Sequence, residues 1–251
     1  MLIYENNDSI LALTTLMHTE QEEQGSLALH CTQNHDAILK NRKVLCDQLH
    51  LSLSQFTFLQ QTHSDHFLEV TKQDCGKGAY SNDDALFDYD AYYTKDIDHP
   101  IGIFTADCLG IVLYDPTSHI IAAIHSGWAG TKKQITAKVL QHLIQKEGLN
   151  PTTTKVFLSP CIQFESLEMG KDILDSFLEL PYDVSSYIRI TSKDKGYLDN
   201  RGLNIEMLLQ TGILPTYIYS APYDTFVDAH MFSYRRNKQC GRHLTMIMWK
   251  Q

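Results

Sequence analysis

The chain has 251 residues, 43% of them hydrophobic, and its 21 Lys and Arg against 30 Asp and Glu give a formal charge of -9. An acidic chain has no overall field that draws it to nucleic acid or to an anionic membrane surface. No apolar run approaches the roughly 20 residues that cross a bilayer, and the N-terminal residues lack the features of a secretion signal. We therefore expect a cytoplasmic protein without a nucleic-acid or membrane partner.

Size and continuity favour one domain over residues 1–251. No internal repeat, low-complexity tract or Pro/Ser-rich linker divides the sequence. The cysteines show no regular spacing, which favours free thiols in a reducing compartment over a disulfide framework. The six are Cys31, Cys46, Cys75, Cys108, Cys161 and Cys240.

The first part of the chain predicts one helix and one strand after an apolar run at residues 9–17. Residues 37–50 have the spacing of a helix that buries one face, and residues 56–63 then predict a strand that ends at His63. His30 and its neighbours lie in a polar stretch without strand or helix signals, so an ordinary loop is expected there.

The centre of the sequence has the clearest pattern. Short β-rich runs alternate with turns, and a glycine turn at residues 126–130 leads into an amphipathic segment that Gly148 is expected to end. The predicted elements are, in chain order, strands at 101–104, 110–115 and 120–125, a helix at 131–148 and a strand at 156–160. The last three form a strand, helix, strand unit of the kind that usually crosses over right-handedly.

The C-terminal part adds two helices and three strands. In chain order they are a helix at 169–180, a strand at 187–191, a short helix at 203–212 and strands at 216–222 and 244–249. This mixture predicts an α/β or mixed α+β fold with a mixed sheet, whose strand order the pattern does not give.

Three side chains, His63, Cys108 and His125, form a candidate metal site. Catalytic zinc commonly has three protein ligands and one open position, and two imidazoles with one thiolate also accommodate copper. Each residue lies where an apolar strand ends or bends, next to Ser, Asp or Gly. Any one of them alone is more often a packed or hydrogen-bonded residue, so the combination carries the prediction.

Asp107 precedes Cys108 and has two readings. Beside a metal its carboxylate would orient a water or act as a general base, and otherwise it would cap a local turn. Gly127 and Gly130 let the backbone approach a ligand closely before the predicted helix, so they are candidates for phosphate binding. A basic segment near the C-terminus, with Arg235, Arg236 and Arg242, offers guanidinium groups that match phosphate oxygens.

Seven motifs occur in the order and wording of the YfiH family. They are QQTHSD, DDALF, TADCLGIVLYDP, AAIHSGWAGT, LSPCI, LDN followed by Asn204, and FSYRRNKQCGRH. The chain resembles this family over roughly residues 58–249. The family, once called the laccase-domain or polyphenol oxidase group, is now regarded as purine nucleoside phosphorylases. The resemblance implies a single-domain, sandwich-like α/β fold with a mixed sheet flanked by helices.

The same resemblance implies a metal, zinc or copper, held by His63, Cys108 and His125. It implies phosphorolysis of adenosine, inosine, guanosine or methylthioadenosine, together with deamination of adenosine, in a monomer or small homo-oligomer. Purine nucleosides and inorganic phosphate are then the partners. The family's basic residues that match this sequence are Arg42 and the pair Arg235 and Arg236.

Three departures from the family pattern remove side chains from the expected site. Ala129 replaces an arginine, Asp224 and Thr225 replace a Cys-Thr pair, and residues 167–170 replace Tyr-Glu-Val-Gly. Three alternatives to the phosphorylase stay open. They are a copper-dependent polyphenol oxidase, an amidase that acts on cell-wall precursors, and a metal-binding module without catalytic activity.

Overall fold

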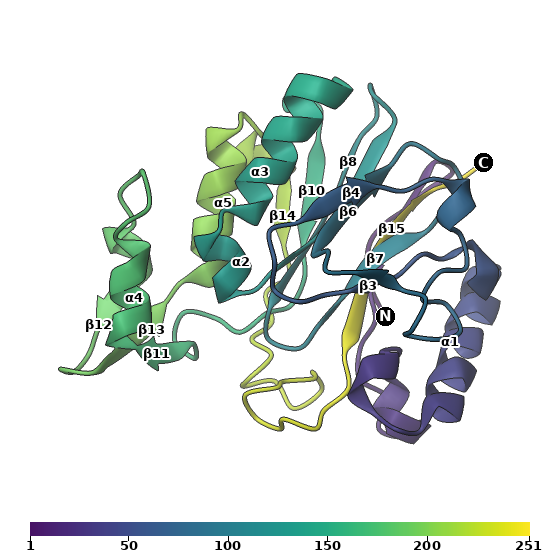
Figure 1. Cartoon of the computed structure of the whole chain (residues 1–251), viewed down its shortest axis with the longest axis horizontal. Helices are drawn as coiled ribbons and strands as arrows, with labels where there is room; N and C mark the ends of the chain where they lie inside the picture. Colours follow the sequence, from purple (N-terminus) through teal and green to yellow (C-terminus); the bar gives the residue numbers. More distant parts are fainter.

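The computed structural model describes the whole chain, residues 1–251. Two β-sheets pack face to face, and helices cover the outer face of each sheet (Figure 1). The mixed α/β class predicted from the sequence is confirmed. The second large sheet is new, because the strand pattern indicated only one.

The four-stranded sheet is antiparallel throughout. Its strands are, in spatial order, β1 (Leu2–Asn6), β2 (Ile10–Thr14), β15 (His243–Trp249) and β7 (Ile101–Thr105). The strand nearest the C-terminus therefore lies between the second strand of the chain and the strand that precedes Cys108.

The six-stranded sheet is mixed. Its strands are, in spatial order, β14 (Ile218–Ser220), β10 (Lys155–Leu158), β8 (Leu109–Asp115), β9 (Ile120–Ser126), β6 (Ala91–Thr94) and β4 (Phe67–Glu69). Every residue of β8 and β9 is buried, as expected for strands covered on both faces. Both β9 and β10 run antiparallel to β8, so they are parallel to each other, and the predicted strand, helix, strand unit is confirmed.

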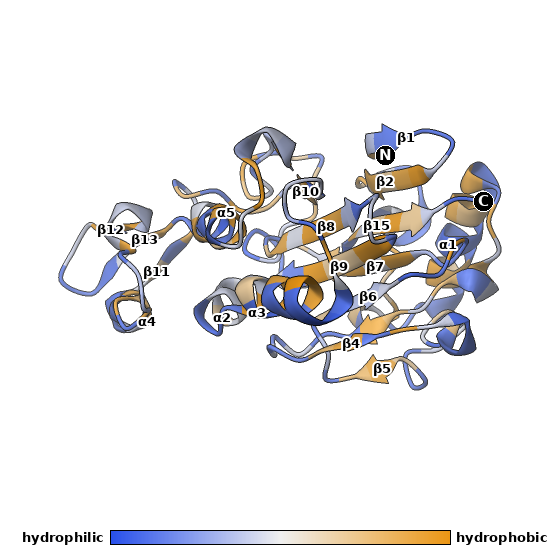
Figure 2. Cartoon of the chain, turned by 90° about the horizontal axis from the view of Figure 1, so that it is seen from above, coloured by the Kyte–Doolittle hydropathy of each residue, from blue (hydrophilic) through white to orange (hydrophobic).

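Three apolar layers hold the sandwich together. Side chains of both sheets, such as Ile103 and Val112, meet in the layer between them. A second layer packs the outer face of the six-stranded sheet against helices, and a third packs Met246 and its neighbours against the helix of residues 35–49. Figure 2 shows these central strands in the hydrophobic colour, whereas the edge strand β1 is largely hydrophilic.

The helices are α1 (His35–Leu49), α2 (Trp128–Lys132), α3 (Ile135–His142), α4 (Lys171–Phe177) and α5 (Asn200–Gln210). The prediction of one helix over residues 131–148 is wrong. Gln134 has a left-handed conformation with a φ of 60°, which separates α2 from α3, and a π-helical turn at Leu143–Glu147 follows. Gly148, with a φ of 80°, ends that turn as predicted. No helix combines the length and apolar character that a membrane span requires.

The predicted strand up to His63 is also too long. Only β3 (Leu59–Gln60) forms there, and it pairs with β5 (Leu86–Phe87). Beyond it the chain bends, with a φ of 61° at His63. The backbone amides of residues 62–64 donate to a buried carboxylate instead of to a neighbouring strand, which ends the ladder.

A small lobe projects from one end of the sandwich in both views (Figures 1 and 2). It consists of α4 and a three-stranded sheet of β11 (Glu168–Gly170), β13 (Lys195–Leu198) and β12 (Ile188–Ile190). Leu203 of α5 packs into the apolar cluster of this lobe, which joins it to the body. One domain over residues 1–251 remains our prediction. All six cysteines are free thiols.

Candidate metal centre and adjoining cavities

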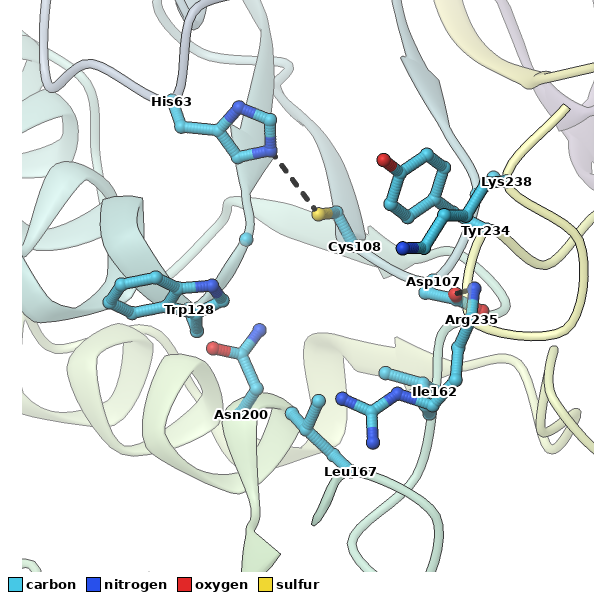
Figure 3. Close-up of a pocket in the computed structure, with 12 residues that line it drawn as sticks. His63, Asp107, Cys108, Trp128, Ile162, Leu167, Asn200, Tyr234, Arg235 and Lys238 are labelled. Carbon is cyan, nitrogen blue, oxygen red and sulfur yellow. Dashed lines mark hydrogen bonds between the residues drawn. The ribbon is translucent and has the colours of Figure 1, made fainter. Parts of the chain in front are cut away.

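His63, Cys108 and His125 meet at the end of the sandwich, where β3, β7, β8 and β9 terminate. Their ligand atoms all lie within 4.8 Å of one another, and Cys108 Sγ is 3.8 Å from His63 Nε2. Zinc bonds of about 2.0 to 2.3 Å in a tetrahedron place ligand atoms about 3.3 to 3.8 Å apart. Small side-chain movements therefore suffice for all three atoms to reach one ion. Figure 3 shows His63 and Cys108 facing each other.

The pairing of β8 with β9 brings Cys108 and His125 close together. Gly110 of β8 is the partner of His125 in β9, so Cys108, just before β8, lies beside the end of the strand that carries His125. Gly127 follows that strand. A Cβ atom there would lie 2.7 Å from Cys108 Sγ and 3.1 Å from His63 Cδ2. Only glycine leaves room for the three side chains, which gives Gly127 a steric role at the centre.

A buried carboxylate, Asp90, orients two sides of the centre. Asp90 Oδ1 accepts a hydrogen bond from His125 Nδ1 at 2.6 Å, and Oδ2 accepts from the Ser64 amide at 2.6 Å and from the Ser64 hydroxyl at 2.7 Å. This arrangement holds a proton on His125 Nδ1 and makes Nε2 the ring nitrogen that can bind a metal. Sequence reasoning missed Asp90, although an acidic residue directly before the buried strand β6 is a usable signal.

The charges of the centre favour a thiolate. Burial opposes ionisation of Cys108, but the neighbouring His125 and His63 imidazoles outweigh it and lower the pKa of the thiol. Burial opposes the charge on His125, yet Cys108 and Asp90 together raise its pKa. Burial likewise opposes ionisation of Asp90, but hydrogen bonds from His125 and Ser64 hold its pKa well below the usual range. A thiolate is the form of cysteine that binds transition metals.

A first cavity of about 420 Å³ opens on one side of the centre. This volume lies within the range of about 300 to 1,000 Å³ that is common for small-molecule sites. Figure 3 shows Trp128 and Tyr234 on opposite sides of it. Its lining is His63, Ala106, Asp107, Cys108, Gly127, Trp128, Ile162, Leu167, Asn200, Tyr234, Arg235 and Lys238. Of these, Trp128, Asn200 and Lys238 were not singled out as candidate ligand-binding residues from the sequence.

A second cavity of about 360 Å³ adjoins the same centre. It shares His63, Ala106, Cys108 and Tyr234 with the first cavity, so the candidate metal ligands stand at the junction of the two. The rest of its lining is His30, Gln61, Phe104, Thr105, His125 and Arg242. His30 lies on a short 3-10 turn and lines this cavity, a position that the expectation of an ordinary loop did not anticipate.

Asp107 lies in the wall of the first cavity and has a left-handed φ of 86°. Its Oδ1 accepts from the Thr225 hydroxyl at 2.7 Å, and its Oδ2 accepts from the Arg235 amide at 2.6 Å. Both oxygens therefore tie the turn before β8 to the loop of residues 221–242. Neither interpretation of Asp107 from the sequence anticipated this long-range clamp, and its role in proton transfer stays a prediction.

The other predicted anion-binding residues fall into two groups, those that line a cavity and those that do not. Arg235 lines the first cavity, and its Nη1 donates to the Glu168 carbonyl in the small lobe. Arg42, Arg236 and Gly130 line neither cavity. The guanidinium of Arg42 is buried and donates to backbone carbonyls of residues 27, 78 and 79, while that of Arg236 donates to carbonyls of residues 225, 226, 228 and 231. Gly130 is buried inside α2. The structure thus gives these three residues structural contacts.

A model of the family described as multi-copper polyphenol oxidoreductase laccase matches residues 17–250. The chain belongs to this family. Among its curated relatives, a Bacillus subtilis (strain 168) protein named purine nucleoside phosphorylase YlmD is 28% identical over 98% of this chain and 91% of its own length. A Staphylococcus aureus (strain N315) protein, also named a purine nucleoside phosphorylase, is 31% identical over 84% of this chain and 79% of its own.

Solved structures of the family have the same fold. The Bacillus licheniformis protein YfiH superposes with a TM-score of 0.91 at 25% identity and covers 99% of both chains. YlmD from Geobacillus stearothermophilus gives a TM-score of 0.91 at 26% identity, over 96% of this chain and 92% of its own. The resemblance to the YfiH family and the sandwich-like fold that it implied are therefore confirmed.

Proposed function

We propose that this chain is a zinc-dependent purine nucleoside phosphorylase. The observation that carries the proposal is the convergence of His63, Cys108 and His125 at the junction of two cavities large enough for a small ligand. The names of the curated relatives supply the reaction class. Adenosine, inosine, guanosine and methylthioadenosine are the proposed substrates, with inorganic phosphate as the second one.

The donor set fits zinc. The neighbouring imidazoles lower the pKa of Cys108, which favours the thiolate that zinc binds, Asp90 accepts from His125 Nδ1 so that Nε2 is the atom available to a metal, and His63 completes a set of three ligands. A bound zinc ion would supply Lewis-acid polarisation of a substrate oxygen in this pocket. Copper accepts the same ligands, so the metal is a part of the proposal that needs direct measurement.

The first cavity suits a nucleoside. Trp128 and Tyr234 offer aromatic faces to a flat base, and Ile162 and Leu167 add apolar surface. In phosphorolysis the bond from the ribose anomeric carbon to the base breaks, and a bond from that carbon to a phosphate oxygen forms. The proton of hydrogen phosphate ends on the departing base. The protein's part is to hold the two substrates in line, which lowers the entropic share of the barrier.

A multi-copper oxidase, the reaction in the family description, is less consistent with these residues. Electron transfer between several copper ions needs several groups of ligands. The chain has one cluster of three or more His, Cys, Asp or Glu side chains with metal-ligand spacing. This single centre supports the phosphorylase over the oxidase.

Chromatography of inosine and adenosine incubated with the purified protein tests the proposal. Hypoxanthine or adenine together with ribose 1-phosphate should form only when phosphate is present. No free base from any purine nucleoside would refute the proposed reaction. Inosine formed from adenosine without phosphate would add the deaminase activity that the family resemblance implies.

Metal analysis and one variant test the centre itself. The protein as purified should hold about one zinc per chain. Cys108→Ala should lose the metal and at least about 100-fold in kcat/KM, because the remaining two imidazoles do not make a catalytic zinc site. Cys75→Ser is the matched control, since Cys75 lies on a turn and lines neither cavity. Full turnover by Cys108→Ala would remove the metal from the reaction.

A further inference from the structure

We propose that the second cavity, lined by His30, Thr105 and Arg242, binds the inorganic phosphate, and that the first cavity takes the nucleoside. The inference rests on the proposed function, because it divides the two substrates of that reaction between the two cavities that adjoin one centre. It assigns a ligand to a cavity in which, apart from the candidate metal ligands, the sequence had indicated only Arg242 as a candidate phosphate-binding residue.

Thr105 gives the first observation. It is the last residue of β7, its side chain is 2% exposed, and its hydroxyl has no hydrogen-bond partner. Ile101 and Ile103 of the same strand pack between the two sheets, so Thr105, two residues further on, lies on the same face where the sandwich ends. A buried hydroxyl without a partner costs free energy, and a valine of the same shape would avoid that cost. A ligand that accepts a hydrogen bond from Thr105 accounts for the hydroxyl.

Arg242 gives the second observation. Its Nη1 donates to the carbonyls of Cys240 and Gly241, and the guanidinium lies 5.5 Å from the centre of the Tyr234 ring. The Nε and Nη2 groups make no hydrogen bond within the chain, which leaves donors for an oxyanion. The His30 ring, packed edge-on against Phe104, lines the same cavity.

The charge of the side chains that line the second cavity favours an anion. None of the side chains that line it is a carboxylate, whereas Arg242 is a permanent cation and Thr105 and His30 add neutral donors. Inorganic phosphate matches a guanidinium, a hydroxyl and an imidazole better than a flat base does.

The first cavity has a larger apolar wall, and the cations Arg235 and Lys238 line it together with the Asp107 carboxylate. Trp128, Ile162 and Leu167 give it an apolar wall, and Asn200 lies in its lining. Asn200 is buried, its amide nitrogen donates to the Ser126 carbonyl, and its Oδ1 has no partner. An unpaired carbonyl oxygen suits the N–H groups of a purine or the hydroxyls of ribose, and it would repel phosphate.

The two cavities share the lining residues His63 and Cys108, so a substrate bound at these residues would reach into both cavities. An in-line displacement needs the incoming phosphate oxygen and the departing base on opposite sides of the anomeric carbon. The ribose would then lie at the junction, with the base toward Trp128 and the phosphate toward Thr105. Each substrate enters its own cavity, and the products separate by the same two routes.

Thr105→Val and Arg242→Gln test this division. Calorimetric titration of the metal-loaded protein with inorganic phosphate should show binding weakened about 10-fold or more in each variant. The KM for phosphate should rise by a similar factor while the KM for inosine stays within about two-fold. Without phosphate, Thr105→Val should unfold at the same temperature as the wild type or higher, because it removes an unpaired buried hydroxyl.

Thr245→Val is the matched control. Thr245 is buried on the neighbouring strand β15, and its hydroxyl is bonded to that of Thr14 at 2.8 Å. That variant should lower the unfolding temperature and leave phosphate binding unchanged. Phosphate binding equal to the wild type in both Thr105→Val and Arg242→Gln would overturn the inference, as would a rise in the KM for inosine alone. If the wild type cleaves no nucleoside, the proposed function fails, and the phosphate titration still decides whether this cavity is an oxyanion site.

Discussion

The two walls of the candidate site are held by different kinds of contact. On one wall Cys108 and His125 lie at the ends of paired strands, and Asp90 fixes the imidazole from behind. On the other wall Tyr234 and Arg235 belong to the loop of residues 221–242, which connects β14 to β15 and contains no strand. Asp107 and Arg236 hold that loop through a few side-chain contacts.

Because the contacts differ, each wall determines a different property of the site. The sheet wall sets the distances among the metal ligands, because its backbone ladder fixes the strand ends relative to one another. The loop wall shapes the cavity for the nucleoside, and its position depends on single hydrogen bonds. Substitutions on the sheet wall should therefore act on metal binding, and substitutions on the loop wall should act on KM.

The strongest test on the sheet wall is Asp90→Asn. An amide cannot accept all the hydrogen bonds that His125, Ser64 and the bend at His63 now donate to the carboxylate. Zinc affinity should fall about 10- to 100-fold, and the unfolding temperature should drop as well. Competition with a chelator measures the affinity. Asp88→Asn is the control, since Asp88 is only half-buried and bonds to Thr62 and His66. Unchanged zinc affinity in Asp90→Asn would contradict the role of Asp90.

Gly127→Ala should also weaken zinc binding, by about 10-fold. The added methyl group would overlap Cys108 Sγ and press on His63, so the ligands must separate. Gly148→Ala separates this effect from a general loss of stability. Gly148 has a positive φ and open space around it, so that variant should lose stability and keep its zinc affinity. Equal zinc affinity in both variants would show that the centre tolerates the methyl group.

Asp107→Asn tests the loop wall and should have a smaller effect. An asparagine keeps an acceptor for only one of the Thr225 and Arg235 donors, so the loop should loosen and the KM for inosine should rise about three- to ten-fold. The kcat and the zinc content should change little. A fall in kcat of about 1,000-fold or more, with an altered pH profile, would instead identify Asp107 as the proton-transfer group.

His243 connects the two walls, and its titration should make the stability of the protein depend on pH. Its Nε2 accepts from the Phe232 amide of the loop, and Nδ1 is 2.8 Å from the Thr15 carbonyl. Burial lowers the pKa of His243 to about 4. The unfolded chain then binds a proton as the pH falls below about 6.5, so stability is present above that value and declines toward pH 4. Between pH 7.5 and 5.5, the titration of His243 should lower the free energy of unfolding by about 1 kcal/mol.

Denaturant unfolding of the wild type and of His243→Gln across this range checks the effect. The variant should be less stable at pH 7.5, because it loses the two hydrogen bonds, but its stability should vary less with pH. Parallel pH curves for the two proteins would show that other groups cause the decline.

The sequence was sufficient to predict that His63, Cys108 and His125 converge as candidate metal ligands, because each follows or precedes an apolar strand in a recognisable motif. It was insufficient for Asp90 and Thr105, whose importance depends on what lies opposite them in space. Arg42 and Arg236 illustrate the converse limit. Their position in the sequence does not reveal that backbone carbonyls already occupy their guanidinium groups.

The fold, like the site, could be predicted from the sequence only in part. The helix at α1 and the strands β7, β8 and β9 follow from local periodicity, because their apolar patterns are strong. The second sheet does not, since it depends on β15 pairing with β2 and β7 from distant parts of the chain. The break at Gln134 was also missed, because nothing in the local pattern signals a left-handed residue there.

The place of β15 has a consequence for biosynthesis. Thr14 and Thr245 bond to each other across 231 positions of sequence, and β2 reaches β7 only through β15. While residues 243–249 are still inside the ribosome, β2 and β7 lack their common partner, so the four-stranded sheet is incomplete. The apolar face of the six-stranded sheet then remains exposed to solvent. A nascent chain of this protein therefore exposes apolar surface until residues 243–249 have been made, and this surface favours aggregation at that stage.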